Sequence, residues 1–318
     1  MTRITRRNFA ALAGALALAP VSRSLAADQP KEFVIGYQKT GLLVIAREQA
    51  TIEKRLEKLG VAVKWVEFAS GPPLLEALNV GSVHFGYTGD TPPIFAQAAG
   101  ANLVYVGAAP SNGAGEGVIV KPDSPIKSLA DLKGKRIGFT KGSSSNNLTI
   151  AAVEKAGLKF SDITPIYLSP ADAAAAFAGD QIDAWTIWDP FFAIAQQRYN
   201  PRVLVTSRDV LNVNTYLLAN ATYAAKYPSI VAAANDGLAD AAQWAAQNRD
   251  KVAQSLAKVT GVDLAAQTVA ANRADFGVLT LTPEIIARQQ ESADRFYRLG
   301  LIPRAIVVRD AVWTRPQA

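Results

Sequence analysis

The 318-residue sequence contains no cysteine. Disulfides, zinc–thiolate sites, iron–sulfur clusters and a cysteine nucleophile are therefore excluded. Histidine is almost as scarce, because the chain holds only His84, within the strand-like alternation of Val83–Tyr87. A Ser-His-Asp triad or a histidine metal site would have to use this one residue. We interpret His84 as a structural residue on one face of a sheet, and we expect no metal and no cofactor.

Basic charge is scarcer than the net charge of +6 suggests. Residues 1–26 hold four arginines and no acidic residue, and Arg6 and Arg7 precede an apolar run from Phe9 to Pro20. This pattern predicts an export signal over residues 1–26. Thr5–Phe9 resembles a twin-arginine signal, and an ordinary secretory signal is the alternative. The remaining chain has 29 basic and 27 acidic residues, so its charge does not indicate a nucleic-acid-binding surface.

Long apolar runs are absent after the signal, so no further segment is expected to span a membrane. Strand-like and helix-like segments alternate instead, which favours an α/β fold with mostly parallel sheets. The composition shifts to small residues at Ser111–Gly117, a second alternating series follows, and the chain from Thr222 onward is nearly all helical. We therefore predict a first lobe of residues 31–113 and 218–318 and a second lobe of residues 114–217.

Four strand-to-helix turns of the predicted lobes carry polar residues. Ligands of open α/β sheets bind beyond the carboxyl ends of the strands, so these turns are expected to meet at a cleft between the lobes. Each turn could also be a plain helix cap. The turns are Gln38–Gly41, before an expected helix over Gly41–Leu59; Gly89–Thr91, before Pro92; Gly142–Ser145; and Trp188–Pro190, with Asp189 as the expected N-cap and Pro190 as the first helical residue.

The third turn, within "IGFTKGSSSNNLTIAAVEKAG" (Ile137–Gly157), is the most informative. A helix start leaves backbone N–H groups without internal partners and favours an anion. Gly142 permits close approach of a ligand, and Ser143, Ser144 and Ser145 add hydroxyl donors. The turn has neither the lysine-ended phosphate loop nor the glycine fingerprint of nucleotide sites. It suits a small tetrahedral anion held by neutral donors, and a sulfonate fits because it stays charged without an acid or base.

Longer motifs connect these turns to a known family. The segments "FASGPPLLEALNVGSVHFGYTGDTPPIFAQAAGANLVYVG" and "IDAWTIWDPFFA" are similar to those of the aliphatic-sulfonate substrate-binding proteins of ABC transporters. The resemblance extends over Phe33–Val312. It implies the two-lobed periplasmic binding protein fold (type II), a sulfonate ligand acquired as a sulfur source, and delivery to an ABC permease in the inner membrane. We expect a periplasmic monomer without a nucleic-acid partner.

The resemblance also implies ligand-facing positions in both lobes. Because a carboxylate repels a sulfonate, we expect Asp90 either to cap its own helix or to bind an amino or hydroxyl group of the ligand. Asn214 is a further candidate near the return crossing. The implied ligand-binding residues are Gln38, Thr40, Gly89, Asp90 and Thr91 in the first lobe, and Ser143, Ser144, Ser145, Trp185 and Asp189 in the second.

Two other functions fit some of these residues. The ligand could be another small anion: taurine, nitrate, an aryl sulfonate or a sulfate ester. An exported enzyme could use Asp90 and Asp189 as acid and base. The enzyme is disfavoured because the polar turns contain no histidine and the chain contains no cysteine. We therefore predict a binding protein without catalytic residues.

Overall fold

Two five-stranded sheets, one in each lobe, organise the computed structural model, which describes residues 30–316. The predicted export signal lies outside this range. One strand of each sheet, β10 or β5, is antiparallel to its neighbours, and the remaining strands run parallel, as predicted. The first sheet has the order β2 (Ala62–Glu67), β1 (Glu32–Tyr37), β3 (Phe85–Thr88), β10 (Thr215–Asn220), β4 (Leu103–Ala109); the second has the order β7 (Thr164–Tyr167), β6 (Arg136–Phe139), β8 (Ala184–Trp188), β5 (Glu116–Val120), β9 (Arg202–Thr206).

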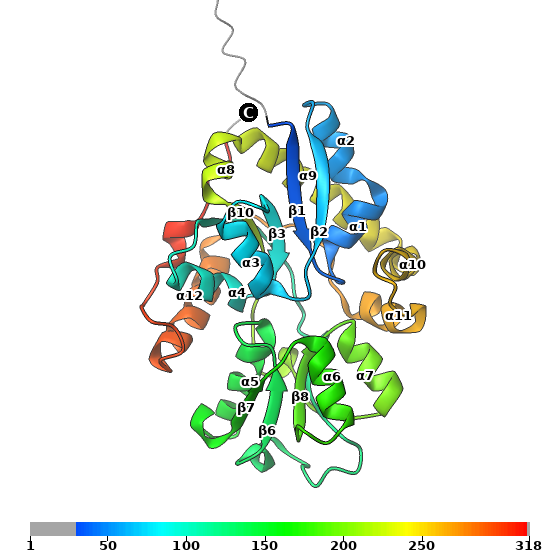
Figure 1. The fold of residues 1–318 in the computed structure, drawn as a ribbon, viewed down its shortest axis with the longest axis vertical. Helices are drawn as coiled ribbons and strands as arrows, with labels where there is room; N and C mark the ends of the chain where they lie inside the picture. The colour runs from blue at the N-terminus through cyan, green and yellow to red at the C-terminus, as the bar shows by residue number, and fades with distance from the viewer. Residues whose placement is uncertain (1–29, 317–318) are drawn as a thin grey trace, which may run out of the picture.

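Helices flank both sheets, and the two lobes lie end to end along the long axis of the molecule (Figure 1). The second lobe contains α5 (Ser144–Lys155), α6 (Pro170–Ala178) and α7 (Phe191–Tyr199). The first lobe contains α1 (Leu42–Gln49), α2 (Thr51–Glu57), α3 (Gly71–Asn79), α4 (Thr91–Ala98), α8 (Ala221–Lys226), α9 (Pro228–Gln247), α10 (Arg249–Thr260), α11 (Leu264–Arg273) and α12 (Pro283–Arg298).

The chain crosses between the sheets twice, after β4 and after β9. The return crossing ends at Thr215, because β10 pairs along its whole length with the first sheet. The expected boundary between residues 217 and 218 therefore falls inside a strand. Gly113 lies where the two crossings meet: its φ is +68°, and a Cβ there would lie 2.3 Å from the backbone nitrogen of Arg208. Only glycine fits this contact without a backbone shift.

The helix expected over Gly41–Leu59 is in fact two helices. Ala50 adopts a left-handed conformation, with φ of 50°, and separates α1 from α2. Both helices then pack on α9, where Gly237 lies so close to Ile52 that an added Cβ would sit 2.8 Å from its Cα. Sequence periodicity did not reveal the break, because alanine is a strong helix former and tertiary packing outweighs its propensity here.

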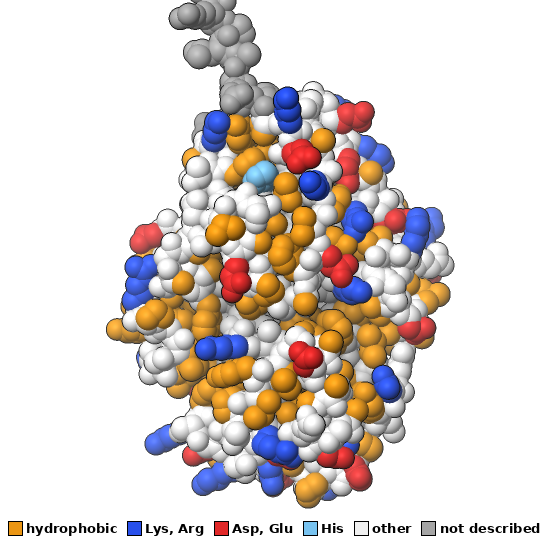
Figure 2. All heavy atoms as spheres, in the orientation of Figure 1, with side chains coloured by type: hydrophobic (Ala, Val, Ile, Leu, Met, Phe, Trp, Pro, Cys, Tyr) orange, Lys and Arg blue, Asp and Glu red, His pale blue; other side chains and the backbone are white. Residues whose placement is uncertain are grey.

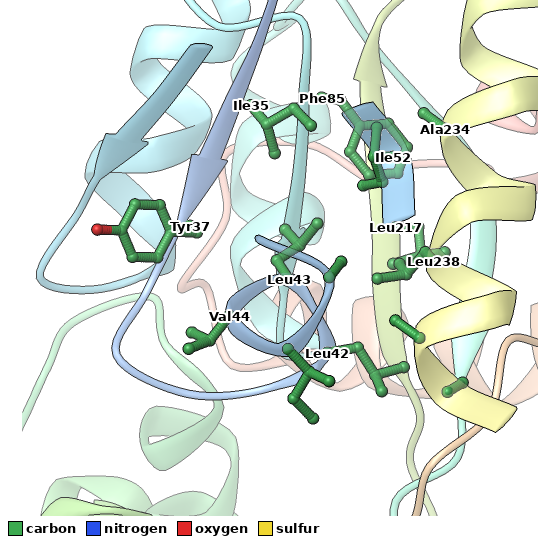
Figure 3. Close-up of a cluster of buried hydrophobic side chains, with 14 of the residues drawn as sticks. Ile35, Tyr37, Leu42, Leu43, Val44, Ile52, Phe85, Leu217, Ala234 and Leu238 are labelled. Atoms are coloured by element: carbon green, nitrogen blue, oxygen red, sulfur yellow. The ribbon is translucent and has the colours of Figure 1, made fainter. Parts of the chain in front are cut away.

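Apolar side chains from α1, β1 and α9 form the main core of the first lobe. Figure 3 shows Ile35, Leu43 and Leu238 converging between the sheet and the helices. All three are at most 1% exposed, and burying a side chain of this kind contributes about 1.5–3 kcal/mol. The second lobe has apolar clusters on both faces of its own sheet. Each lobe is therefore a stable support for the residues at its edge.

His84 is a structural residue, as predicted. Its Nδ1 accepts a hydrogen bond from the backbone N–H of Val34 at 3.0 Å, and its ring stacks on Tyr223 with centroids 4.0 Å apart. Burial lowers the pKa of His84, which favours the neutral ring that this contact needs.

Charged side chains of both signs are interspersed on the face in Figure 2. Among residues 30–316, no helix has the length and apolar character needed to cross a membrane.

Candidate functional site

A cleft between the lobes holds a cavity of about 190 Å³. Since one water occupies about 30 Å³ of liquid, the cavity has room for a small organic molecule. Both lobes contribute to its wall, which places the predicted turns opposite one another. The implied residues that line it are Gln38, Thr40, Gly89, Asp90, Ser143, Ser144 and Asp189, and Asn214 lines it as well.

Three of the implied residues lie outside the wall of the cleft. Trp185 is 2% exposed and packs on Phe177 in the core of the second lobe. The prediction that it lines the cleft is wrong, and Trp188 lines the cleft instead. The alternation of a strand explains the error, because side chains three residues apart point to opposite faces. Thr91 and Ser145 are fully buried behind the cleft wall.

The N-terminus of α5 lies at the cleft, where its first turn offers backbone donors. The amide hydrogens of Ser144 and Ser145 have no acceptor among residues 30–316, as expected for the first turn of a helix. Gly142, with φ of +69°, leads the chain into this turn. The turn presents uncharged donors at the positive end of the helix dipole, a combination that favours an anion.

The serine hydroxyls, however, donate to oxygens of the protein itself. Ser143 donates to the carbonyl oxygen of Thr140 at 2.7 Å. Ser144 and Ser145 both donate to Oε1 of Glu116, at 2.7 and 3.0 Å. Sequence reasoning missed Glu116, although it is the only acidic residue of the small-residue segment that begins the second lobe. Burial raises the pKa of Glu116 to about 7.

The expectation that Asp90 caps its own helix is wrong, while Asp90 does line the cleft. Its side chain does not cap α4. Its Oδ2 accepts a hydrogen bond from Nδ2 of Asn147 at 2.6 Å, which joins the first lobe to the second. Oδ1 of Asn147 in turn accepts from Arg295 of α12 at 3.0 Å, and Arg295 forms an ion pair with Glu154 at 3.4 Å. We call these four residues the α12 clasp, because they connect α12 and α4 to α5. Burial raises the pKa of Asp90 to about 6.

Asp189 belongs to a second interlobe contact, on the side of α11. The prediction that Asp189 is the N-cap is wrong by one residue, because α7 begins at Phe191 and Pro190 holds the cap position. Oδ1 of Asp189 still accepts a hydrogen bond from the backbone N–H of Ala193 at 3.0 Å. Arg273, at the end of α11, reaches Asp189 at 3.3 Å and also donates to Gln196. We call Arg273, Asp189 and Gln196 the α11 clasp. Burial raises the pKa of Asp189 to about 6, and Arg273 opposes this shift.

The charges on the cleft wall are mostly negative. Asp90, Glu116, Asp189 and Asp275 line it, against Arg273 as the one basic residue of the lining. Within the described part of the chain, these carboxylates do not form a cluster suited to a metal ion. An anion in this cleft would meet dipoles and hydrogen-bond donors rather than an excess of positive charge.

Comparison with known proteins identifies the family to which this chain belongs. The sequence from residue 56 to 252 matches the family described as NMT1/THI5 like. The chain belongs to the NMT1/THI5-like family. A protein of Escherichia coli (strain K12) named as an aliphatic sulfonates-binding protein is 41% identical to this family member over 311 residues, 96% of each chain.

Two solved structures share the fold of this NMT1/THI5-like protein. The alkanesulfonate-binding protein SsuA from Xanthomonas axonopodis pv. citri, bound to MOPS, is 40% identical with a TM-score of 0.86, over 90% of this chain and 99% of that one. The periplasmic aliphatic sulphonate binding protein SsuA from Escherichia coli is 41% identical with a TM-score of 0.82, over 91% and 94%. The predicted two-lobed binding-protein fold is thereby confirmed.

Proposed function

We propose that this protein is the substrate-binding component of an ABC importer that takes up aliphatic sulfonates as a source of sulfur. The carrying observation is the unpaired N-terminal turn of α5, which faces an interlobe cleft in a fold shared over nearly the whole chain with sulfonate-binding proteins. A sulfonate is a permanent anion that accepts hydrogen bonds, and this turn supplies donors without a counter-charge. The proposed ligand-contacting residues are Gln38, Thr40, Gly89, Ser143, Ser144 and Trp188.

The two clasps support a function that depends on closure of the two lobes. Each joins a first-lobe arginine to second-lobe acceptors, and neither contact survives if the lobes separate. A ligand that bridges the lobes shifts the population toward the closed arrangement, which the permease can then recognise. The full-length relatives are binding proteins, which argues against catalysis by Asp90 and Asp189. In this structure both carboxylates serve the clasps.

Calorimetry on the chain after removal of the export signal tests the ligand. We expect ethanesulfonate to bind with micromolar affinity, about −8 kcal/mol, because several hydrogen bonds to a charged group contribute roughly 1.5–3 kcal/mol each before association costs. Taurine, nitrate, an aryl sulfonate and a sulfate ester are titrated in parallel. If one of them binds and ethanesulfonate does not, the ligand assignment is wrong while the binding role stands. If ethanesulfonate is turned over, the protein is an enzyme.

Export through the twin-arginine route and a monomeric state are part of the same proposal. The paired Arg6 and Arg7 before an apolar run support the route. Fusing residues 1–30 to a reporter that folds before export tests it, with Arg6→Lys/Arg7→Lys as the matched control. The route is supported if the reporter reaches the periplasm only with the arginine pair intact. Light scattering of the protein with and without ethanesulfonate tests the monomer.

A further inference from the structure

On the wall of the cleft, the hydrogen-bond donors around Glu116 do not match what an ionised carboxylate and a bound anion together require. Ser144 and Ser145 direct their hydroxyl hydrogens to Oε1 of Glu116, beside the amide groups of the α5 turn. An ionised carboxylate only accepts hydrogen bonds, and so does a sulfonate. With Glu116 ionised, two acceptor-only groups therefore compete for the same few donors and also repel each other.

One added proton removes the mismatch. A protonated Glu116 has an O–H that can donate to Ser144 or to the ligand, and the hydroxyl hydrogen of Ser144 then becomes available for the ligand. Charge repulsion between the two groups disappears at the same time. The proton comes from solvent, adds to the carboxylate of Glu116 when the anion enters, and returns to solvent when it leaves.

We propose that Glu116 is a specificity-determining residue that receives the ligand headgroup in its protonated form, so that capture of an acceptor-only anion takes up one proton. This inference rests on the proposed function. It assigns Glu116 the task of admitting singly charged headgroups. Doubly charged anions such as sulfate are disfavoured, because the carboxylates of Asp90, Asp189 and Asp275 also line the cleft.

The other charged groups around Glu116 strengthen this assignment. Glu116 begins β5 and pairs with Trp188 of β8. Thr206 of β9, which pairs with the next residue Gly117, and the first turn of α5 are uncharged. Burial is the largest cause that raises the pKa of Glu116. The hydrogen bonds from Ser144 and Ser145 lower this pKa, while Asp90 and Asp189 raise it further. Arg273 is engaged by Asp189 in the α11 clasp, and Asp275 lines the same cleft. Protonation at Glu116 thus meets no competing cation.

The test is the pH dependence of ethanesulfonate binding, measured by calorimetry between pH 6.5 and 8.5. Tris and imidazole are used as buffers, because MOPS is itself a sulfonate and occupies a related protein. A group of pKa near 7 that must be protonated weakens binding about 25-fold over this range. Glu116→Gln keeps an acceptor for both serines and adds a permanent donor, so we expect affinity close to that of the wild type at pH 6.5 and no pH dependence.

Glu57→Gln, at the exposed end of α2, is the matched control and should behave as wild type. A wild-type affinity that is constant with pH overturns the inference. A slope that persists in Glu116→Gln also overturns it, because the proton then belongs to another group such as Asp90 or Asp189. Failure of every sulfonate to bind at pH 6.5 is a separate result and refutes the proposed function instead.

A second measurement covers the case in which Glu116→Gln fails to fold, as judged by circular dichroism. Binding enthalpies of the wild type in tris and in imidazole at pH 7.5 differ in proportion to the protons exchanged. We expect uptake of about 0.8 proton per ligand at this pH. Uptake near zero contradicts the proposal without any variant. Sulfate titrated at pH 6.5 should bind at least tenfold more weakly than ethanesulfonate, and equal affinity contradicts the selectivity.

Discussion

Replacing Arg273 by methionine should weaken sulfonate binding without unfolding the protein. The Arg273 guanidinium lies 3.3 Å from Asp189, and the two side chains are 23% and 9% exposed. At an effective dielectric constant of about 20, the gross attraction across this distance is about 5 kcal/mol. Desolvation cancels much of it, which leaves the roughly 1.5–3 kcal/mol typical of a hydrogen bond to a charged group. Because the contact joins the lobes, its loss lowers the closed population.

The expected result for Arg273→Met is a Kd for ethanesulfonate that is about 10- to 100-fold higher, measured by calorimetry at pH 6.5. Methionine can still pack against Phe192, over which Arg273 now lies at 4.7 Å, so most of the effect should come from charge. Small-angle scattering should show a larger radius of gyration in the presence of ligand. Arg298→Met, at the exposed end of α12, is the control. A Kd within twofold of wild type, with unchanged scattering, refutes the role assigned to this contact.

Four other substitutions test the packing around the cleft and the cores. Gly89→Ala should raise the Kd at least tenfold with little change in melting temperature, because its Cβ would lie 2.9 Å from Cβ of Ser144 in the opposite lobe; an unchanged Kd in calorimetry contradicts this contact. His84→Gln should make the free energy of unfolding fall less steeply than in the wild type as the pH is lowered. The folded-state pKa of His84 is lowered, so its contribution to stability is present above pH 6.5 and is lost as pH falls. We expect this contribution to be about 1 kcal/mol in urea unfolding. The same change in unfolding free energy between pH 7.5 and pH 5 in the wild type and in His84→Gln disproves it. Trp188→Ala should reduce affinity, whereas Trp185→Phe should cost about 1–2 kcal/mol of stability in urea unfolding and leave affinity intact; the reverse pattern would restore Trp185 to the cleft.

The sequence predicts the architecture well because strand and helix periods are local properties. The order of strands and helices, the two lobes and the polar turns at the strand ends all follow from such periods. Ala50 is the exception in the first lobe, since nothing in its own residue type favours a left-handed backbone. Trp185 is misplaced because a strand's facing depends on register, and a shift by an odd number of residues moves a side chain to the other face.

The site is predictable only as far as its segments carry recognisable motifs. Ser143 and Ser144 follow a glycine at a helix start, a pattern that indicates an anion site from residue types alone. Arg273 lies in a helical region without a motif and reaches the cleft only through tertiary packing. Glu116 stands in a flexible-looking segment, and its importance appears only when Ser144 and Ser145 are seen to share one of its oxygens.

The ion pairs of the two clasps have the same polarity across the gap between the lobes. Arg273 and Arg295 both extend from the first lobe, whereas their carboxylate partners, Asp189 and Glu154, belong to the second. When the lobes move apart, each of these arginines still faces its carboxylate partner across the gap, so attraction within these two pairs favours closure. Added salt screens this attraction and increases the open fraction. The equilibrium between the open and closed lobes, and with it the retention of a bound ligand, therefore depends on ionic strength.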